Sequence, residues 1–220
     1  EFRRVLFRSP LWETKNETAR RVRGRIEAIL DWAAAGGLRS RENPARWRGL
    51  LQHRLSKQPR SARIQHHPAL DYRKMSPFMV RLRAEEGDAA RCLEFTVLVG
   101  CRTSEATGMR WSEVDLDKAL WVVPANRIKA GKAHRVPLVG RALEIIRAQG
   151  RYRTSEFVFN GRKADTGLSN MAMATVLKRL GYGKVTVHGF RRSLRDWAAE
   201  VTNYPREVAE MRSEEHTSEL

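Results

Sequence analysis

Cysteine is scarce in this sequence, and long apolar runs are absent from it. The 220 residues include two cysteines, Cys92 and Cys101, which are too few for a disulfide framework or a zinc site. We expect both to be core thiols, because free cysteine behaves as a small buried hydrophobe. No stretch approaches ~18 consecutive apolar residues, so the sequence predicts no membrane span. We also find no long helix with one apolar and one basic face, the pattern typical of a membrane-surface protein.

Acidic residues are few relative to basic ones. Lys and Arg number 42 and Asp and Glu number 25, which gives a formal net charge of +17. This balance favours a polyanionic partner, and nucleic acid first, because each phosphate neutralised by Lys or Arg releases a condensed counterion. The sequence offers no convincing carboxylate cluster for magnesium, which argues against a metal-dependent nuclease. We therefore expect neither a metal site nor a cofactor.

The two ends of the chain do not join the patterns beside them. Residues 1–9 (EFRRVLFRS) and 212–220 (RSEEHTSEL) resemble translated sequencing-adapter read-through, and we exclude them from fold prediction. Between them, the stretch from Ser56 to His67 is polar and basic, contains Pro59 and has no periodicity. We place a linker at residues 59–67 and expect two native units, residues 10–58 and 68–211.

Hydrophobic periodicity predicts a mainly α fold with a small antiparallel β-sheet (α+β). Thr14 and Glu17 have the spacing of a capping box for a helix that ends at Gly36-Gly37, and Asn43-Pro44 is typical of a second, short helix. In the second unit, helices are expected to begin near residues 76, 88, 141, 169 and 188. Short strands are expected at residues 120–123, 127–129, 134–138 and 157–159.

Three basic clusters hold the residues that could perform chemistry. They contain Arg102 and Glu105 at a helix start, Lys129 in a basic hairpin, and His188 with Arg191 on one side of a helix. Cleavage of a phosphodiester builds negative charge on its non-bridging oxygens, and fixed guanidinium groups can hold these oxygens. A lysine or a histidine can move protons. Two Arg, one Lys and one His would therefore serve phosphoryl transfer without a metal.

The order of these motifs resembles the tyrosine recombinase (phage integrase) family, nearest to the P4-like integrases. The matching segments are Arg-Thr-x-Glu from Arg102, Arg-x-Lys ending at Lys129 with His-x-Val-Pro-Leu behind it, and His-Gly-Phe-Arg from His188. The resemblance covers roughly residues 10–211. It implies a partial helical core-binding domain at residues 10–58 and a tyrosine recombinase catalytic domain at 68–211, truncated at its carboxy-terminal end.

The resemblance also implies a role for each site residue and a set of partners. Arg102 and Arg191 would be the catalytic arginines, Lys129 the hairpin lysine and His188 the histidine of the His-x-x-Arg pair, with Glu105 orienting Arg102. The activity implied is site-specific DNA recombination through a 3′-phosphotyrosine. The partner would be duplex DNA at attachment sites, bound by a homotetramer in the cytoplasm of a bacterial cell, at the nucleoid.

The resemblance is incomplete where the nucleophile should follow. The family continues with a Leu-x-His-like motif and then a tyrosine, and neither is found before the foreign-looking tail. Tyr204 precedes that point, and His216 belongs to the excluded end, so neither is assigned a catalytic role. We therefore expect this 220-residue chain to bind DNA and to be inactive as a recombinase.

Other interpretations of the same residues remain open at this stage. Lys132 is a rival to Lys129 as the hairpin lysine, and Glu105 could be ordinary helix support. His66 and His67 are expected to be a solvated linker pair, since no further ligand stands at metal spacing. The alternative function is a non-catalytic basic DNA-binding protein, which would need a base-reading element that we do not find.

Overall fold

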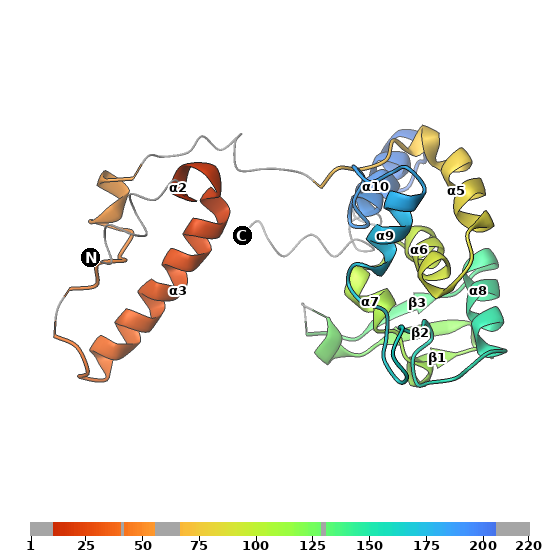
Figure 1. The fold of residues 1–220 in the computed structure, drawn as a ribbon, viewed down its shortest axis with the longest axis horizontal. Coiled ribbons are helices and arrows are strands. Elements are labelled where there is room, and N and C mark those ends of the chain that lie inside the picture. Colours follow the sequence, from red (N-terminus) through yellow and green to blue (C-terminus); the bar gives the residue numbers. More distant parts are fainter. Residues whose placement is uncertain (1–10, 41, 56–66, 129–130, 206–220) are drawn as a thin grey trace. The chain divides into compact units, whose positions relative to one another are not determined.

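The chain, seen in a computed structural model, forms two compact units, residues 1–65 and 66–220 (Figure 1). The structure describes residues 11–40, 42–55, 67–128 and 131–205. The first unit is helical, and the second combines helices with a small sheet. Among the described helices, none combines the length and the apolar composition that a membrane span requires.

The first unit is dominated by one long helix. Its elements are α2 (Leu11–Thr14), α3 (Asn16–Ala35) and a 3-10 turn, η1 (Leu51–His53). The capping box predicted at Thr14 is wrong, because Thr14 ends α2 and Lys15 occupies the N-cap of α3 without a side-chain cap. Instead, the Asn16 side-chain amide donates to the Trp12 carbonyl at 3.1 Å and bridges the two helices.

The short helix predicted from Asn43 does not form, and the chain turns there instead. The Asn43 side chain is buried, and its amide donates to the Glu27 carbonyl (2.8 Å) and to the Asp31 carboxylate (2.7 Å). Its side-chain oxygen accepts from the N–H of Ala45 at 2.9 Å. These side-chain bonds replace the backbone bonds that a helix would have made.

The second unit packs its helices around α6. Its helices are α5 (Met75–Ala84), α6 (Asp88–Val99), α7 (Thr103–Thr107), α8 (Gly140–Gly150), α9 (Ala172–Arg179) and α10 (Gly189–Val201), with 3-10 turns η2 (Tyr72–Lys74), η3 (Trp111–Glu113) and η4 (Ala125–Arg127). Helices α5, α7, α8 and α9 all contact α6 (Figure 1). Leu93 and Phe95 of α6 are fully buried in the resulting core.

The sheet is a three-stranded antiparallel meander in the order β1 (Val114–Asp115), β2 (Leu120–Val123), β3 (His134–Pro137). Trp121 of β2 stands opposite Val114 and Val136 and is fully buried against Phe95, with the ring centroids 5.6 Å apart. The fold class predicted from the sequence is therefore confirmed.

The strand predicted at residues 127–129 is wrong where the structure describes it. Residues 125–127 form the 3-10 turn η4, closed by the N–H of Arg127 donating to the carbonyl of Pro124 at 3.0 Å. At residues 157–159, the expected strand is reduced to an isolated bridge between Phe157 and Arg110.

A buried carboxylate joins three helices of the second unit. Glu94 of α6 is fully buried and pairs with Arg83 (3.0 Å), Arg91 (2.6 Å) and Arg141 (3.0 Å). Burial alone would raise the pKa of Glu94. Hydrogen bonds from Arg141 and Arg83 and the charge of Arg91 outweigh burial and lower that pKa. The charged form of Glu94 is therefore the one that the folded state prefers.

We predict that Glu94→Gln lowers the free energy of unfolding at neutral pH by up to about 3 kcal/mol, because breaking a buried ion pair is strongly destabilising. A depressed folded-state pKa contributes stability above the unfolded-state value, near 4.5, and that contribution is lost as pH falls through the folded-state value. The gap between wild type and variant should therefore narrow below pH 4.5. Urea denaturation from pH 7 to pH 3 measures the free energy of unfolding of both proteins.

Glu144→Gln is the matched control, because Glu144 is an exposed partner of Arg141 in the same helix (3.3 Å). We expect it to change the free energy of unfolding by about 0.5 kcal/mol or less. If the difference in free energy of unfolding between wild type and Glu94→Gln stays constant across this pH range, Glu94 is not stabilised in its charged form.

Candidate functional site

The turn between α6 and α7 positions the first predicted arginine. Arg102 is the N-cap residue of α7, and Glu105 lies one turn into that helix, where it is buried. The Glu105 carboxylate accepts from the backbone N–H of Arg102 (2.8 Å) and from Nη1 of its guanidinium (3.0 Å). One carboxylate therefore holds both the backbone and the side chain of Arg102, while a quarter of that side chain stays exposed.

The second predicted arginine reaches the same turn from α10. Arg191 is 4% exposed and donates from Nη1 to the carbonyl oxygen of Gly100 at 2.7 Å. Gly100 has a φ of +69°, and a Cβ there would lie 2.7 Å from Cδ2 of Leu194. The positive φ favours glycine at this position, and the Leu194 side chain of α10 occupies the space that a Cβ would need. The structure places Arg191 against the turn that leads into Arg102.

Cys101 occupies the core side of this turn. Burial raises the pKa of its thiol to about 12, the Glu105 carboxylate acts in the same direction, and the charge of Arg191 opposes them. The thiol is therefore neutral at ordinary pH and behaves as a small buried core side chain. Cys92 is buried as well, so both cysteines are core side chains, as expected.

The predicted hairpin lysine lies outside the described residues. Arg127, at the base of the hairpin, donates to the Glu113 carboxylate and to the backbone carbonyls of Ser104 (3.2 Å) and Glu105 (2.8 Å). These bonds tie the hairpin to α7. Residues 129 and 130 are not described, and Lys132, the rival to Lys129, is exposed.

His188 immediately precedes α10 and is half-buried. Its ring centroid lies 4.6 Å from that of His67, with the two rings tilted by 60°. His66 is outside the described residues. His67 is exposed, as expected, but its ring also contacts the ring of His188. No local pattern could have revealed this contact, because it joins segments that are far apart in the sequence.

No group of three His, Cys, Asp or Glu side chains in the described part of the chain is arranged to hold a metal ion. The cationic groups at the α6–α7 turn would instead favour an anion such as a phosphate.

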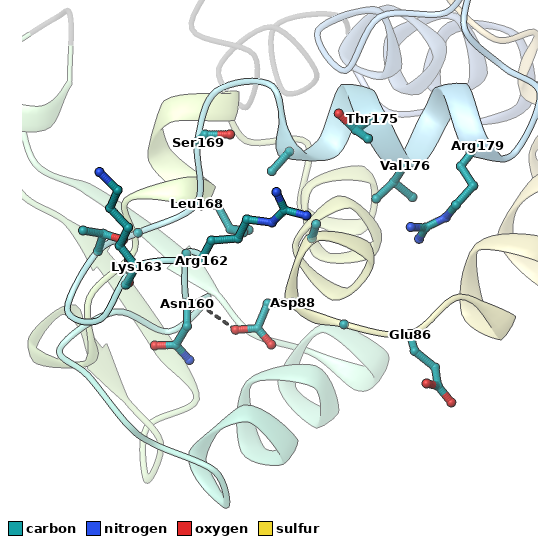
Figure 2. Close-up of a pocket in the computed structure, with 16 residues that line it drawn as sticks. Glu86, Asp88, Asn160, Arg162, Lys163, Leu168, Ser169, Thr175, Val176 and Arg179 are labelled. Atoms are coloured by element: carbon teal, nitrogen blue, oxygen red, sulfur yellow. Dashed lines mark hydrogen bonds between the residues drawn. The ribbon is translucent and has the colours of Figure 1, made fainter.

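A separate depression lies between the start of α6, the loop at residues 160–169 and α9, with a volume of about 670 Å³ (Figure 2). Arg162, Lys163 and Arg179 contribute positive charge, and Arg179 pairs with Glu85. Asp88 is engaged by the N–H of Asn160 at 2.5 Å. None of the predicted site residues that the structure describes lines this depression, and no sequence motif predicted it.

Comparison with known families gives two matches that together cover most of the chain. Residues 70–216 match the phage integrase family, and residues 4–50 match the phage integrase central domain. The first match alone spans well over half of the sequence.

Curated relatives are integrases. The chain is 32% identical over 181 residues to the prophage integrase IntZ of Escherichia coli (strain K12), covering 81% of this chain and 43% of IntZ. It is 26% identical over 200 residues to the integrase of Enterobacteria phage P4, covering 82% of this chain and 44% of that protein. The chain therefore spans less than half the length of these relatives.

Solved structures share the fold at low sequence identity. A lambda integrase dimer bound to a core site gives a TM-score of 0.66 at 16% identity, over 94% of this chain and 72% of that one. The Tn1549 transposon integrase in complex with circular intermediate DNA gives 0.63 at 13% identity, over 90% of this chain and 71% of that one.

We predict that Glu105→Ala lowers the free energy of unfolding by about 1–3 kcal/mol, because it leaves the N–H and guanidinium of Arg102 without their carboxylate. Chemical denaturation measures the change. Glu156→Ala is the control, because Glu156 is an exposed partner of Arg110 (2.6 Å), and we expect about 0.5 kcal/mol or less. Equal stability of the two variants would show that the bonds from Glu105 to Arg102 contribute little to the fold.

Proposed function

The chain belongs to the phage integrase family of tyrosine recombinases, of the P4-like type, and on that premise we propose that the whole protein performs site-specific DNA recombination. The observation that supports this most directly is the pair of arginines at the α6–α7 turn. Glu105 fixes Arg102, and Arg191 bonds the carbonyl of Gly100. Two guanidiniums from distant segments stand at one turn, where they could hold one scissile phosphate.

The proposed reaction needs no metal and no cofactor. A tyrosine oxygen attacks the scissile phosphorus, the bond from phosphorus to the 5′-oxygen breaks, and a 3′-phosphotyrosine forms. Arg102 and Arg191 stabilise the charge on the non-bridging oxygens. Lys129 protonates the departing 5′-oxygen, and His188 assists proton transfer from the tyrosine. The covalent intermediate stores the energy of the broken bond, so strands can be rejoined without ATP.

We propose the following domain boundaries and binding partners. Residues 10–58 belong to a helical core-binding domain, residues 59–67 are a linker, and residues 68–211 carry the catalytic domain. The partner is duplex DNA at attachment sites, bound by a homotetramer at the nucleoid, in the bacterial cytoplasm. The charge of +17 supports a polyanionic partner.

The nucleophile is proposed to lie outside these 220 residues. Tyr204 follows the end of α10 and is 71% exposed, and it precedes the place where the family's tyrosine motif begins. The chain would therefore keep the groups that hold the phosphate without the group that attacks it.

We predict no covalent protein–DNA adduct from the 220-residue chain on a nicked suicide substrate that carries the attachment site. The matched comparison replaces residues 212–220 with the corresponding carboxy-terminal segment of IntZ, which should restore adduct formation. Denaturing gel electrophoresis detects the adduct. If the unextended chain forms one, its nucleophile is present after all, and peptide mapping would identify it. Failure of both proteins would contradict the recombinase assignment.

We predict that this chain binds duplex DNA with weak sequence preference and with affinity that falls steeply as salt rises. Neutralising about six phosphates would cost roughly a thousandfold in affinity between 50 and 200 mM salt. Fluorescence anisotropy on attachment-site and unrelated duplexes measures this. Affinity that does not change over this salt range would rule out an electrostatic mode.

A further inference from the structure

We propose that His67 is a positioning residue that fixes the imidazole of His188. The proposal rests on the proposed function, in which His188 assists proton transfer. Its starting observation is the contact between the two rings, whose centroids are 4.6 Å apart at a tilt of 60°. The two imidazoles are therefore in direct contact, although they lie on segments far apart in the sequence.

The backbone beside His67 is anchored to the start of α10. The Pro68 carbonyl accepts from the N–H of Thr186 (3.0 Å) and from its hydroxyl (3.3 Å). The same hydroxyl accepts from the N–H of Gly189 at 3.0 Å, so one threonine links this segment to the first residue of α10. His67 is thus attached to a fixed point beside His188.

The backbone at Pro68 also packs closely against the start of α10. A Cβ on Gly189 would lie 2.2 Å from the carbonyl oxygen of Pro68, so the two backbones touch where only glycine fits. One turn further along α10, the Ser193 hydroxyl donates to the carbonyl of Leu70. The segment around Pro68 is therefore held along the first turn of α10.

Proline limits the freedom that His67 retains. The ring of Pro68 disfavours the helical region for the residue before it and directs His67 to an extended backbone. With its backbone fixed, the imidazole of His67 reaches His188 at little further cost in conformational entropy. His67 is exposed and His188 is half-buried, so the outer ring covers part of the inner one. Contact on this face restricts the directions in which the nitrogens of His188 can point.

The consequence for catalysis is geometric. A proton-transfer group must lie within hydrogen-bond reach of the oxygen that it serves, and a misplacement of about 1 Å can cost a hundredfold in rate. His67 would not touch the DNA in this role. It would keep His188 in the orientation from which His188 reaches the tyrosine.

The first test detects the contact between the rings of His67 and His188 in the 220-residue chain, by NMR of the imidazole side chains. We expect a nuclear Overhauser contact between the rings of His67 and His188. We also expect His67→Ala to shift the imidazole signals of His188 more than those of His53 and His134. His67→Phe should keep a ring-to-ring contact. Absence of the contact in wild type, or His188 signals that His67→Ala leaves in place, would overturn the proposal whatever the protein's activity.

The second test measures single-turnover cleavage by the full-length protein at saturating DNA. We expect His67→Ala to slow cleavage about tenfold without changing the DNA dissociation constant or the melting temperature. His67→Phe should recover most of the rate, because it restores packing against His188. Tyr152→Ala is the control, since Tyr152 is an aromatic residue of the same unit that is 77% exposed. An unchanged rate for His67→Ala would overturn the positioning role.

The two tests separate this proposal from the proposed function. If His188→Ala leaves cleavage unchanged while the NMR contact with His67 is present, the catalytic role of His188 fails and the positioning proposal fails with it. If His188→Ala abolishes cleavage and His67→Ala has no effect, the recombinase assignment stands and only the role of His67 is lost.

Discussion

The hydrogen bond from Arg191 to the carbonyl of Gly100 joins α10 to the turn from which α7 begins. Several features fix where that bond can form. The absence of a Cβ on Gly100 leaves room for the Leu194 side chain, and the absence of one on Gly189 lets α10 touch the backbone at Pro68. Arg191 is thus placed by packing before any ligand arrives. Preorganised charge of this kind stabilises a developing negative charge without reorganisation during the reaction.

Largely buried carboxylates hold several arginines of this strongly basic chain in place. Glu105 accepts from Arg102, Glu113 from Arg127, and Glu94 from Arg83, Arg91 and Arg141. Each acid converts a flexible side chain into part of the fold, because a guanidinium with a fixed partner loses its rotamer freedom during folding rather than during binding. Exposed lysines such as Lys132 have no such role in the described structure and suit contacts with a phosphate backbone.

The sequence was sufficient to locate the helices and strands that bury an apolar face, because burial produces a periodic hydrophobic pattern. Helices α6, α8 and α10 and strands β2 and β3 lie close to where hydrophobic spacing placed them. It failed where a polar side chain decided the local conformation: the Asn43 amide formed a turn in place of a helix, and the Asn16 bond to Trp12 moved a helix start. The contact between His67 and His188 could not be predicted, because it depends on how α10 meets the start of the second unit. The motif pattern named Arg102, Glu105, His188 and Arg191, but only the packed fold shows what holds each of them.

We propose that Arg102 and Arg191 hold one phosphate between them. A crystal structure of this chain with a short attachment-site duplex tests this arrangement directly. We expect both guanidiniums to lie within about 3 Å of non-bridging oxygens of a single phosphate, a normal distance for a charge-assisted hydrogen bond. Guanidiniums bound to different phosphates, or an Arg191 that contacts no phosphate in the complex, would contradict it.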